Sequence, residues 1–403
     1  MIKKATILAL AVCLFLTILS PVPIQAQDGL TILDSSVQVE FPSRLSFNVS
    51  ARSEVDITDI RLHYAVDRAS FAQVTSEVYI EFVATTTVDV SWALEMVKIG
   101  GLPPGSSVDY WWTVEDAKGN KVKTSAIRVQ FDDIRYAWHR LTEGKITLHW
   151  YEGEKPFAQE IMAIAQQALE RLNVDTGANL EKPVKIYIYA DAQDLQGAMI
   201  YPQEWTGGVA FTRHGTIAIG IAPDNLYWGK RAIAHELAHL VIHQMTFNPY
   251  SDLPNWLDEG LAMYAEGMLG PEFTTHLDRA IAENSLISVR SLSSPFSAYT
   301  EESLLAYAQS YSLVKFLITN YGQGKMLELL NTFSQGSSYD AALEKVYDFD
   351  TEGLDTLWRD YITALVQPTN GRETHPVLIG TLAALATGLP LASALAPESW
   401  AWR

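Results

Sequence analysis

The sequence predicts a multi-domain chain in which an all-β sandwich is followed by an α+β domain and a C-terminal transmembrane helix. Three observations carry this prediction. Apolar residues alternate with a period of two before residue 133, strands alternate with amphipathic helices after it, and a long uncharged run lies near the C-terminus. The predicted order is a signal peptide at 1–26, a β-sandwich at 28–133, an α+β domain at 135–366, a linker at 367–375 and a transmembrane anchor at 376–396.

The N-terminal segment has the composition of a secretory signal peptide. Lys3 and Lys4 precede an apolar stretch from Ala5 to Leu19, and the small residue Ala26 stands before the polar Gln27. The apolar stretch is short for a membrane-spanning helix, although an uncleaved anchor stays open as the alternative. The single cysteine, Cys13, lies inside this segment, so the mature chain is expected to be exported without disulfides and to depend on core packing.

The region from 28 to 133 is expected to form short strands. Alternation is clear over 60–66 and 108–114, and a turn at 117–120 leads to a strand at 127–131. The run LPPGSSVDYWWTVEDAKGN resembles the end of a fibronectin type III or related immunoglobulin-like domain. No cluster of titratable residues converges in this region, so the resemblance implies a spacer or an adhesion domain.

The pattern changes after Arg135, where strands and helices alternate. KITLHWYEG is expected to be a strand, FAQEIMAIAQQALERL an amphipathic helix and KIYIYA a second strand. A Gly-rich turn and two short strands follow within 205–223. Beyond Glu266 the chain is mostly helical, with a helix pair divided at 321–324 and a last pair within 341–366.

The motif His235-Glu236-Leu237-Ala238-His239 lies between these two parts, in a run with helical periodicity. Residues four apart on a helix have Cβ atoms about 5–6 Å apart on one face, so both imidazoles can converge on one zinc ion. Glu236 is placed on the same side as a general base. His243 continues the stripe, but at 1.5 Å per residue it lies about 12 Å along the helix axis from His235. The three histidines therefore cannot share one ion.

A catalytic zinc ion usually has three protein ligands, and a second amphipathic helix supplies the third candidate. WLDEGLAMYAEG follows a turn that contains proline and asparagine, and it carries Glu259 on its inward face. The spacing from His239 to Glu259 and the segment WLDEGLAMY resemble the gluzincin zinc metallopeptidases of the peptidase-MA-like family. The metzincin pattern is excluded, because Ile242 and Met245 stand where its glycine and third histidine fall.

The resemblance implies a thermolysin-like α+β fold, one Zn²⁺ per chain bound by His235, His239 and Glu259, and Glu236 as the general base. It further implies that Tyr307 donates a hydrogen bond to the oxyanion, with Tyr311 as the rival. Glu266 is either a carboxylate that orients a histidine or a solvated residue.

The segment from Gly208 to Thr212 corresponds to the cleft-bordering strand of the gluzincins, which binds extended peptide by strand addition, unless it forms a plain hairpin. The aminopeptidase branch has a glutamate in this segment that holds the substrate's free amino group. This chain has none there. The resemblance therefore favours an endopeptidase over an aminopeptidase, and a surface adhesion or scaffold protein without activity is the third reading.

The C-terminal part predicts a membrane attachment. Residues 376–397 carry no charge, and SWAWR closes the chain with tryptophans typical of a membrane interface. The alternative is an apolar tail that packs on the domain. The net charge of −18 excludes general nucleic-acid binding. The sequence thus predicts a zinc peptidase on the extracellular face of the cell membrane, or else secreted, with peptide or protein substrates. The sequence leaves the oligomeric state open.

Overall fold

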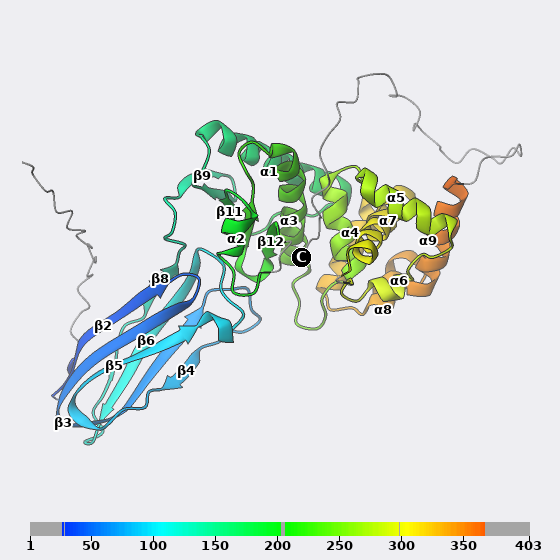
Figure 1. The fold of residues 1–403 in the computed structure, drawn as a ribbon. Coiled ribbons are helices and arrows are strands. Elements are labelled where there is room, and N and C mark those ends of the chain that lie inside the picture. Colours follow the sequence, from blue (N-terminus) through cyan, green and yellow to red (C-terminus); the bar gives the residue numbers. More distant parts are fainter. Residues whose placement is uncertain (1–25, 28, 203–205, 298, 367–403) are drawn as a thin grey trace, which may run out of the picture.

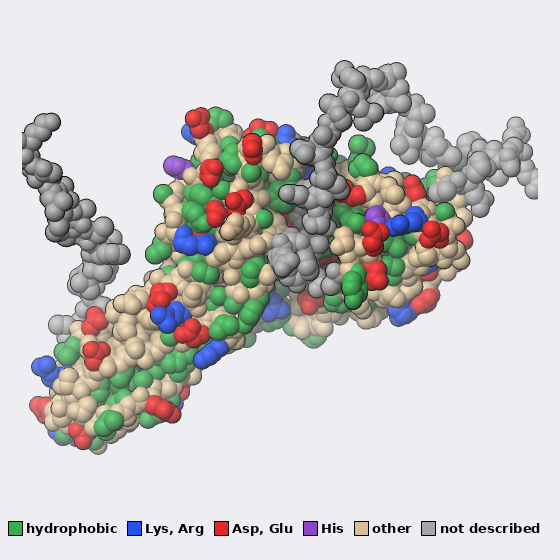
Figure 2. Space-filling model, in the orientation of Figure 1, with side chains coloured by type: hydrophobic (Ala, Val, Ile, Leu, Met, Phe, Trp, Pro, Cys, Tyr) green, Lys and Arg blue, Asp and Glu red, His purple; other side chains and the backbone are tan. Residues whose placement is uncertain are grey.

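The computed structural model describes residues 26–27, 29–202, 206–297 and 299–366. The molecule is elongated (Figure 1). A β-rich N-terminal domain occupies one end, a sheet with its covering helices lies in the middle, and a helical region forms the other end. Red and blue side chains are interspersed over the face drawn in Figure 2. The predicted anchor at 376–396 and residues 1–25 of the predicted signal peptide at 1–26 lie outside the described residues.

The N-terminal domain is β-rich, as the sequence predicts. Its strands are β1 (Ala26–Gln27), β2 (Leu30–Glu40), β3 (Arg44–Val66), β4 (Ser76–Tyr79), β5 (Thr85–Glu95), β6 (Ser106–Asp116), β7 (Lys121–Lys123) and β8 (Ile127–Phe131), with a 3-10 turn η1 (Met96–Lys98). Alternate residues of these strands form one core, which includes Phe47, Tyr110 and Trp112. The fibronectin-like or immunoglobulin-like assignment of this domain stays a prediction.

The long strand β3 connects two groups of strands. Its first half, to Arg52, pairs with β2 and β5, whereas its second half, from Ile57, pairs mainly with β6 and β4. The register shifts between these halves, which is the effect of a bulge. The buried positions change accordingly from Leu45 and Phe47 to Ile60 and Leu62. One continuous strand can therefore take part in both layers of a folded-over sheet.

The second sheet is mixed and belongs to the domain that follows the N-terminal one. Its order is β12 (Gly208–Phe211), β13 (Thr216–Gly220), β11 (Val184–Tyr189), β10 (Ile146–Trp150) and β9 (His139–Glu143). The three inner strands are parallel, whereas β12 and β9 pair antiparallel at the two edges. The sequence analysis did not identify β9. Its residues HRLTE are mostly exposed and show no apolar alternation.

Helices cover this sheet and then build the remaining part of the domain. They are α1 (Lys155–Thr176), α2 (Ala192–Gln196), α3 (Leu226–Thr246), α4 (Asn255–Glu266), α5 (Pro271–Ala282), α6 (Val289–Leu292), α7 (Thr300–Ser334), α8 (Tyr339–Tyr347) and α9 (Thr351–Val366), with a 3-10 turn η2 (Thr212–His214). The predicted break at 321–324 is a kink at Gly322 inside α7, where φ is 82°. None of these helices in the described residues is both long and apolar enough to cross a bilayer.

Asp133 lies at the junction of the two domains and forms several of its polar contacts. Its carboxylate is fully buried and pairs with Arg135 at 2.6 Å, and the hydroxyl of Tyr189 donates to it at 3.0 Å. Phe41 of the N-terminal domain packs on the aromatic cluster around Tyr187 and Tyr189. These contacts fix the N-terminal domain against β11, close to the end of the sheet where the site lies.

Candidate active site

Helix α3 places the two histidines of the HExxH motif. It packs against β12 and β13 of the sheet and against α1 and α4, so most of its surface is buried. Four residues correspond to about one helical turn, which brings His235 and His239 to the same side of α3, facing α4. The exposed fraction of His235 is 1%.

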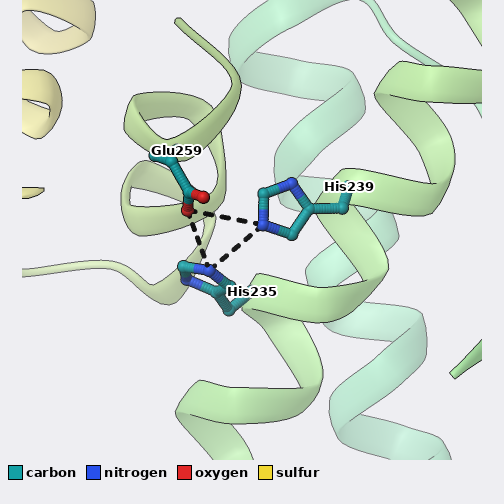
Figure 3. A group of neighbouring side chains, drawn as sticks. All are labelled: His235, His239 and Glu259. Carbon is teal, nitrogen blue, oxygen red and sulfur yellow. Dashed lines mark hydrogen bonds and ion pairs between the residues drawn. The ribbon is translucent and has the colours of Figure 1, made fainter. Parts of the chain in front are cut away.

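Three potential ligand atoms meet between α3 and α4 (Figure 3). The Nε2 atoms of His235 and His239 are 3.2 Å apart, and Oε2 of Glu259 lies 3.5 Å from the first and 3.6 Å from the second. A tetrahedral zinc ion with bonds of about 2.0–2.1 Å holds its ligand atoms about 3.3–3.4 Å from one another. Oε2 of Glu259 is shielded from solvent and has no hydrogen-bond partner among the described residues. The donor set therefore fits a zinc ion.

Two carboxylates orient the histidine rings. Nδ1 of His235 donates to Oε1 of Glu266 at 2.8 Å, and Nδ1 of His239 donates to Oδ1 of Asp258 at 3.0 Å. An ionised carboxylate can only accept, so each neutral ring carries its proton on Nδ1 and leaves a lone pair on Nε2. This is the carboxylate–histidine arrangement that supports bound metals. Of the two readings of Glu266, the structure shows the orienting one, because its side chain is only 1% exposed.

The electrostatics of the cluster favour a cation between the histidines. Burial lowers the pKa of His235, but Glu259 and Glu266 outweigh it and raise that pKa to about 9. Burial raises the pKa of Glu259, but the two histidines outweigh burial and hold that pKa well below its usual range. The carboxylate of Glu259 is thus ionised in the neutral pH range.

Glu236 lies beside the cluster, in a cavity of about 250 Å³. Both histidines, Glu259 and Tyr307 line the same cavity. Burial is the main cause that raises the pKa of Glu236, whose side chain is 4% exposed. The edge strand β12 passes close by. A Cβ atom on Gly208 would lie 3.1 Å from Oε1 of Glu236, so glycine lets the strand approach the carboxylate.

Close packing of two helices places Glu259. A Cβ atom on the next residue, Gly260, would lie 2.5 Å from the carbonyl oxygen of Ser310 and 2.7 Å from Cγ2 of Val314. Only glycine fits at this contact, where α4 crosses α7. The same contact brings α7 to the cavity.

The structure separates the two candidate tyrosines of α7, Tyr307 and Tyr311. Tyr307 is 4% exposed, lines the cavity and packs edge-on against Phe296. Tyr311 packs against Tyr264, with ring centroids 5.9 Å apart, and does not line that cavity. The geometry therefore favours Tyr307 as the residue within reach of a bound substrate.

The sequence analysis did not identify the role of Asp258. One oxygen of this carboxylate accepts from His239, and the other lies 3.0 Å from Nε2 of His243. His243 is thus placed away from the ligand atoms, as the spacing predicts. Asp258 directly precedes Glu259 in the first turn of α4, where carboxylates are common because of the helix dipole. Because the helix dipole already accounts for an aspartate at this position, the sequence gives no sign of its contact with the histidines.

A comparison with protein families matches the part of the chain that contains the histidine cluster. Residues 164–364 match the Peptidase MA superfamily. The match includes α3, α4 and α7 with all of the residues described above, and it supports a gluzincin-like peptidase. Among functionally curated proteins, none matches this sequence.

Several solved structures have a related outline. The M1 zinc metallopeptidase from Deinococcus radiodurans is 14% identical over 85% of this chain and 96% of that chain, with a TM-score of 0.32. OgpA from Akkermansia muciniphila, in complex with an O-glycopeptide, is 10% identical over 28% of this chain and 32% of that chain, with a TM-score of 0.20. At such TM-scores these similarities are too distant to assign an activity or a ligand to this chain.

Proposed function

We propose that this protein is a zinc-dependent endopeptidase of the cell surface that cleaves peptide or protein substrates. One observation carries the proposal. Three ligand atoms of His235, His239 and Glu259 converge at the spacing of a tetrahedral zinc site, with the buried carboxylate of Glu236 in the same cavity. Zinc, when bound there, supplies a Lewis acid for the attacking water and the scissile carbonyl.

The residues of the chain have separate roles in this proposal. Glu236 takes a proton from the attacking water and later gives it to the leaving amine. Its raised pKa suits both steps, because the carboxylate is a stronger base than an exposed one. The hydroxyl of Tyr307 donates a hydrogen bond to the oxyanion of the tetrahedral intermediate. Glu266 and Asp258 hold the histidine rings in place.

The edge strand β12 supports binding of an extended substrate. Among the described residues it pairs with β13 alone, so its other backbone edge is available for strand addition next to Glu236. Substrate backbone on both sides of the cut can pair with such an edge. The substrate therefore needs no free N-terminus.

The carboxylates of the cavity favour the endopeptidase over the aminopeptidase. Among the described residues that line the cavity, the acidic ones are Glu236, Asp258 and Glu259. Each already has a role in this proposal: Glu236 as the general base, Asp258 in orienting His239 and Glu259 as a zinc ligand. None of these is left to neutralise the α-ammonium group of a substrate, and that charge would be repelled beside Zn²⁺.

Digestion of an unstructured peptide library by the zinc-loaded protein tests the proposal. We expect internal fragments by mass spectrometry from peptides with free and with acetylated N-termini. Glu236→Gln should keep its zinc and lose hydrolysis, because an amide cannot accept the proton of water. Glu160→Gln on α1, an exposed residue paired with Lys230, is the matched control and should cleave as the wild type does.

Two results would contradict the proposal. Activity of Glu236→Gln near that of the wild type would remove the general base. Stepwise loss of single residues from free N-termini alone would show an aminopeptidase instead.

A further inference from the structure

A second and larger cavity lies where the N-terminal domain meets the catalytic domain. Its volume is about 600 Å³. The N-terminal domain contributes 67–69, after β3, and 105–107, at the start of β6. The catalytic domain contributes the approach to β11, the turn η2 and the end of α3. Neither domain forms this cavity alone.

Three contacts hold the two walls together. The backbone N–H of Ala69 donates to the carbonyl of Arg213 at 2.6 Å, and Nζ of Lys185 donates to the carbonyl of Gly105 at 2.6 Å. The ring of Phe71 stacks on that of Phe247, with centroids 4.1 Å apart. A hydrogen bond to a backbone carbonyl satisfies Lys185 without cancelling its charge. The cavity is thus a formed feature of the two-domain structure.

The cavity continues the catalytic cleft. Thr212 and His243 line both this cavity and the one that contains Glu236. Strand β12 begins beside Glu236 at Gly208 and leads directly to Thr212. A peptide that lies extended along β12 therefore passes from the histidine cluster into the space between the domains.

The walls of this cavity carry unpaired positive charge. Arg68, Lys182 and Arg213 are exposed, and no carboxylate in the described part of the chain forms an ion pair with them. Asp67 lies on the same wall, but it pairs with Arg128 at 3.7 Å. Asp252 is the other acidic residue of the lining. Burial together with the charge of Arg68 lowers the pKa of His214 to about 4, so this ring adds no charge at neutral pH.

We propose that this interdomain cavity binds acidic residues of the peptide substrate, on one flank of the scissile bond. The positive charge is local, since the chain as a whole has a net charge of −18. Guanidinium groups bind carboxylates through paired hydrogen bonds, so Arg68 and Arg213 suit glutamate or aspartate side chains. The N-terminal domain thereby becomes a part of the substrate site. The position of the acidic residues relative to a cut depends on the proposed peptidase function, but their binding does not.

Fluorescence anisotropy of labelled peptides measures this binding directly. The probes are two twelve-residue peptides of Gly, Ser and Ala that differ only in a run of three glutamates or three glutamines. The full-length protein should bind the acidic probe about tenfold more tightly at low salt, the combined effect of two or three exposed ion pairs. Raising the salt concentration should remove most of the difference.

Charge reversal locates the binding site. Arg68→Glu and Arg213→Glu should each reduce the preference for the acidic probe, and together they should abolish it. Arg52→Glu is the matched control, because Arg52 is also an exposed arginine, on β3 and outside this cavity. Circular dichroism and zinc content of every variant show whether the fold is kept. Should Arg213→Glu not fold, Arg68→Glu alone decides, because Arg68 lies in a loop of the other domain.

Equal affinity of the wild type for both probes would overturn the proposal, and so would an equal effect of Arg52→Glu. Cleavage of the same peptides is followed in parallel. Binding preference without cleavage would support the acidic site and contradict the proposed hydrolysis. Cleavage without any binding preference would support hydrolysis and contradict the acidic site.

Discussion

Nδ1 of His235 and Oε1 of Glu266 are 2.8 Å apart, although the two residues stand 31 positions apart on α3 and α4. The same carboxylate pairs with Arg231 at 2.8 Å through its other oxygen. Glu266 therefore joins the end of α4 to α3 through one buried group. The ring of His235 is held with its Nε2 atom toward Glu259.

Replacement of Glu266 tests this orientation. We expect Glu266→Gln to weaken zinc binding by about 10–100-fold, the usual effect of removing a carboxylate behind a ligating histidine. Competition with a colorimetric zinc chelator gives the affinity. Glu272→Gln on α5, where the side chain is exposed, is the control. An affinity within twofold of the wild type for Glu266→Gln would show that the carboxylate does not support the metal.

Gly260→Ala should destabilise the protein, although alanine is the better helix former. The new Cβ atom would lie 2.5 Å from the carbonyl of Ser310, and relief of such overpacking costs about 1–3 kcal/mol. Gly324→Ala in α7 meets no heavy atom within 4 Å and should gain up to about 1 kcal/mol. Urea unfolding gives both free energies. A loss of stability at neither position would show that α4 and α7 do not meet so closely.

Local patterns in the sequence predict much of the fold and of the candidate site. The spacing of His235, His239 and Glu259 depends on two helices and one turn, and the structure brings these three side chains together. The kink at Gly322 and the strands β10 and β11 follow from equally local signals.

Features that depend on distant contacts could not be predicted. The interdomain cavity has Arg68 and Arg213 in the same lining, and nothing in the sequence near either residue indicates the other. The choice between Tyr307 and Tyr311 depends on how α7 lies against α4. The sequence around the two tyrosines does not distinguish them. The edge strand β9 has too few apolar residues to be recognised.

His149 on β10 should make the stability of the protein sensitive to acid. Its ring stacks on Tyr187, and burial, followed by the charges of Arg140 and Lys185, lowers its pKa to about 4. In the unfolded chain the pKa of histidine is about 6.5, so the unfolded state binds a proton at higher pH than the folded state. The stability contribution is present above pH 6.5 and is lost as the pH falls toward 4.

The variant His149→Phe separates this effect from other acid-sensitive groups. Phenylalanine keeps a ring against Tyr187 and cannot bind a proton. The melting temperature, measured by circular dichroism at pH 7.5 and at pH 5, should therefore fall less for the variant than for the wild type. Equal decreases would show that His149 does not titrate in this range.

The C-terminal segment gives a prediction about location. The uncharged run at 376–396 behind a polar linker favours attachment to the outer face of the membrane. Deletion of all residues after Asn370 should release soluble, still active protein into the medium. Full-length protein that is already soluble without detergent would contradict the anchor.

The zinc content of the purified protein tests the central claim most directly. We expect elemental mass spectrometry to find one zinc ion per chain. The zinc affinity should be weaker in Glu259→Ala than in Glu266→Gln, because Glu259 supplies a ligand atom whereas Glu266 only orients a ligand. Glu272→Ala should retain the affinity of the wild type. Wild-type protein without stoichiometric zinc, or an unchanged affinity in Glu259→Ala, would contradict the metal site.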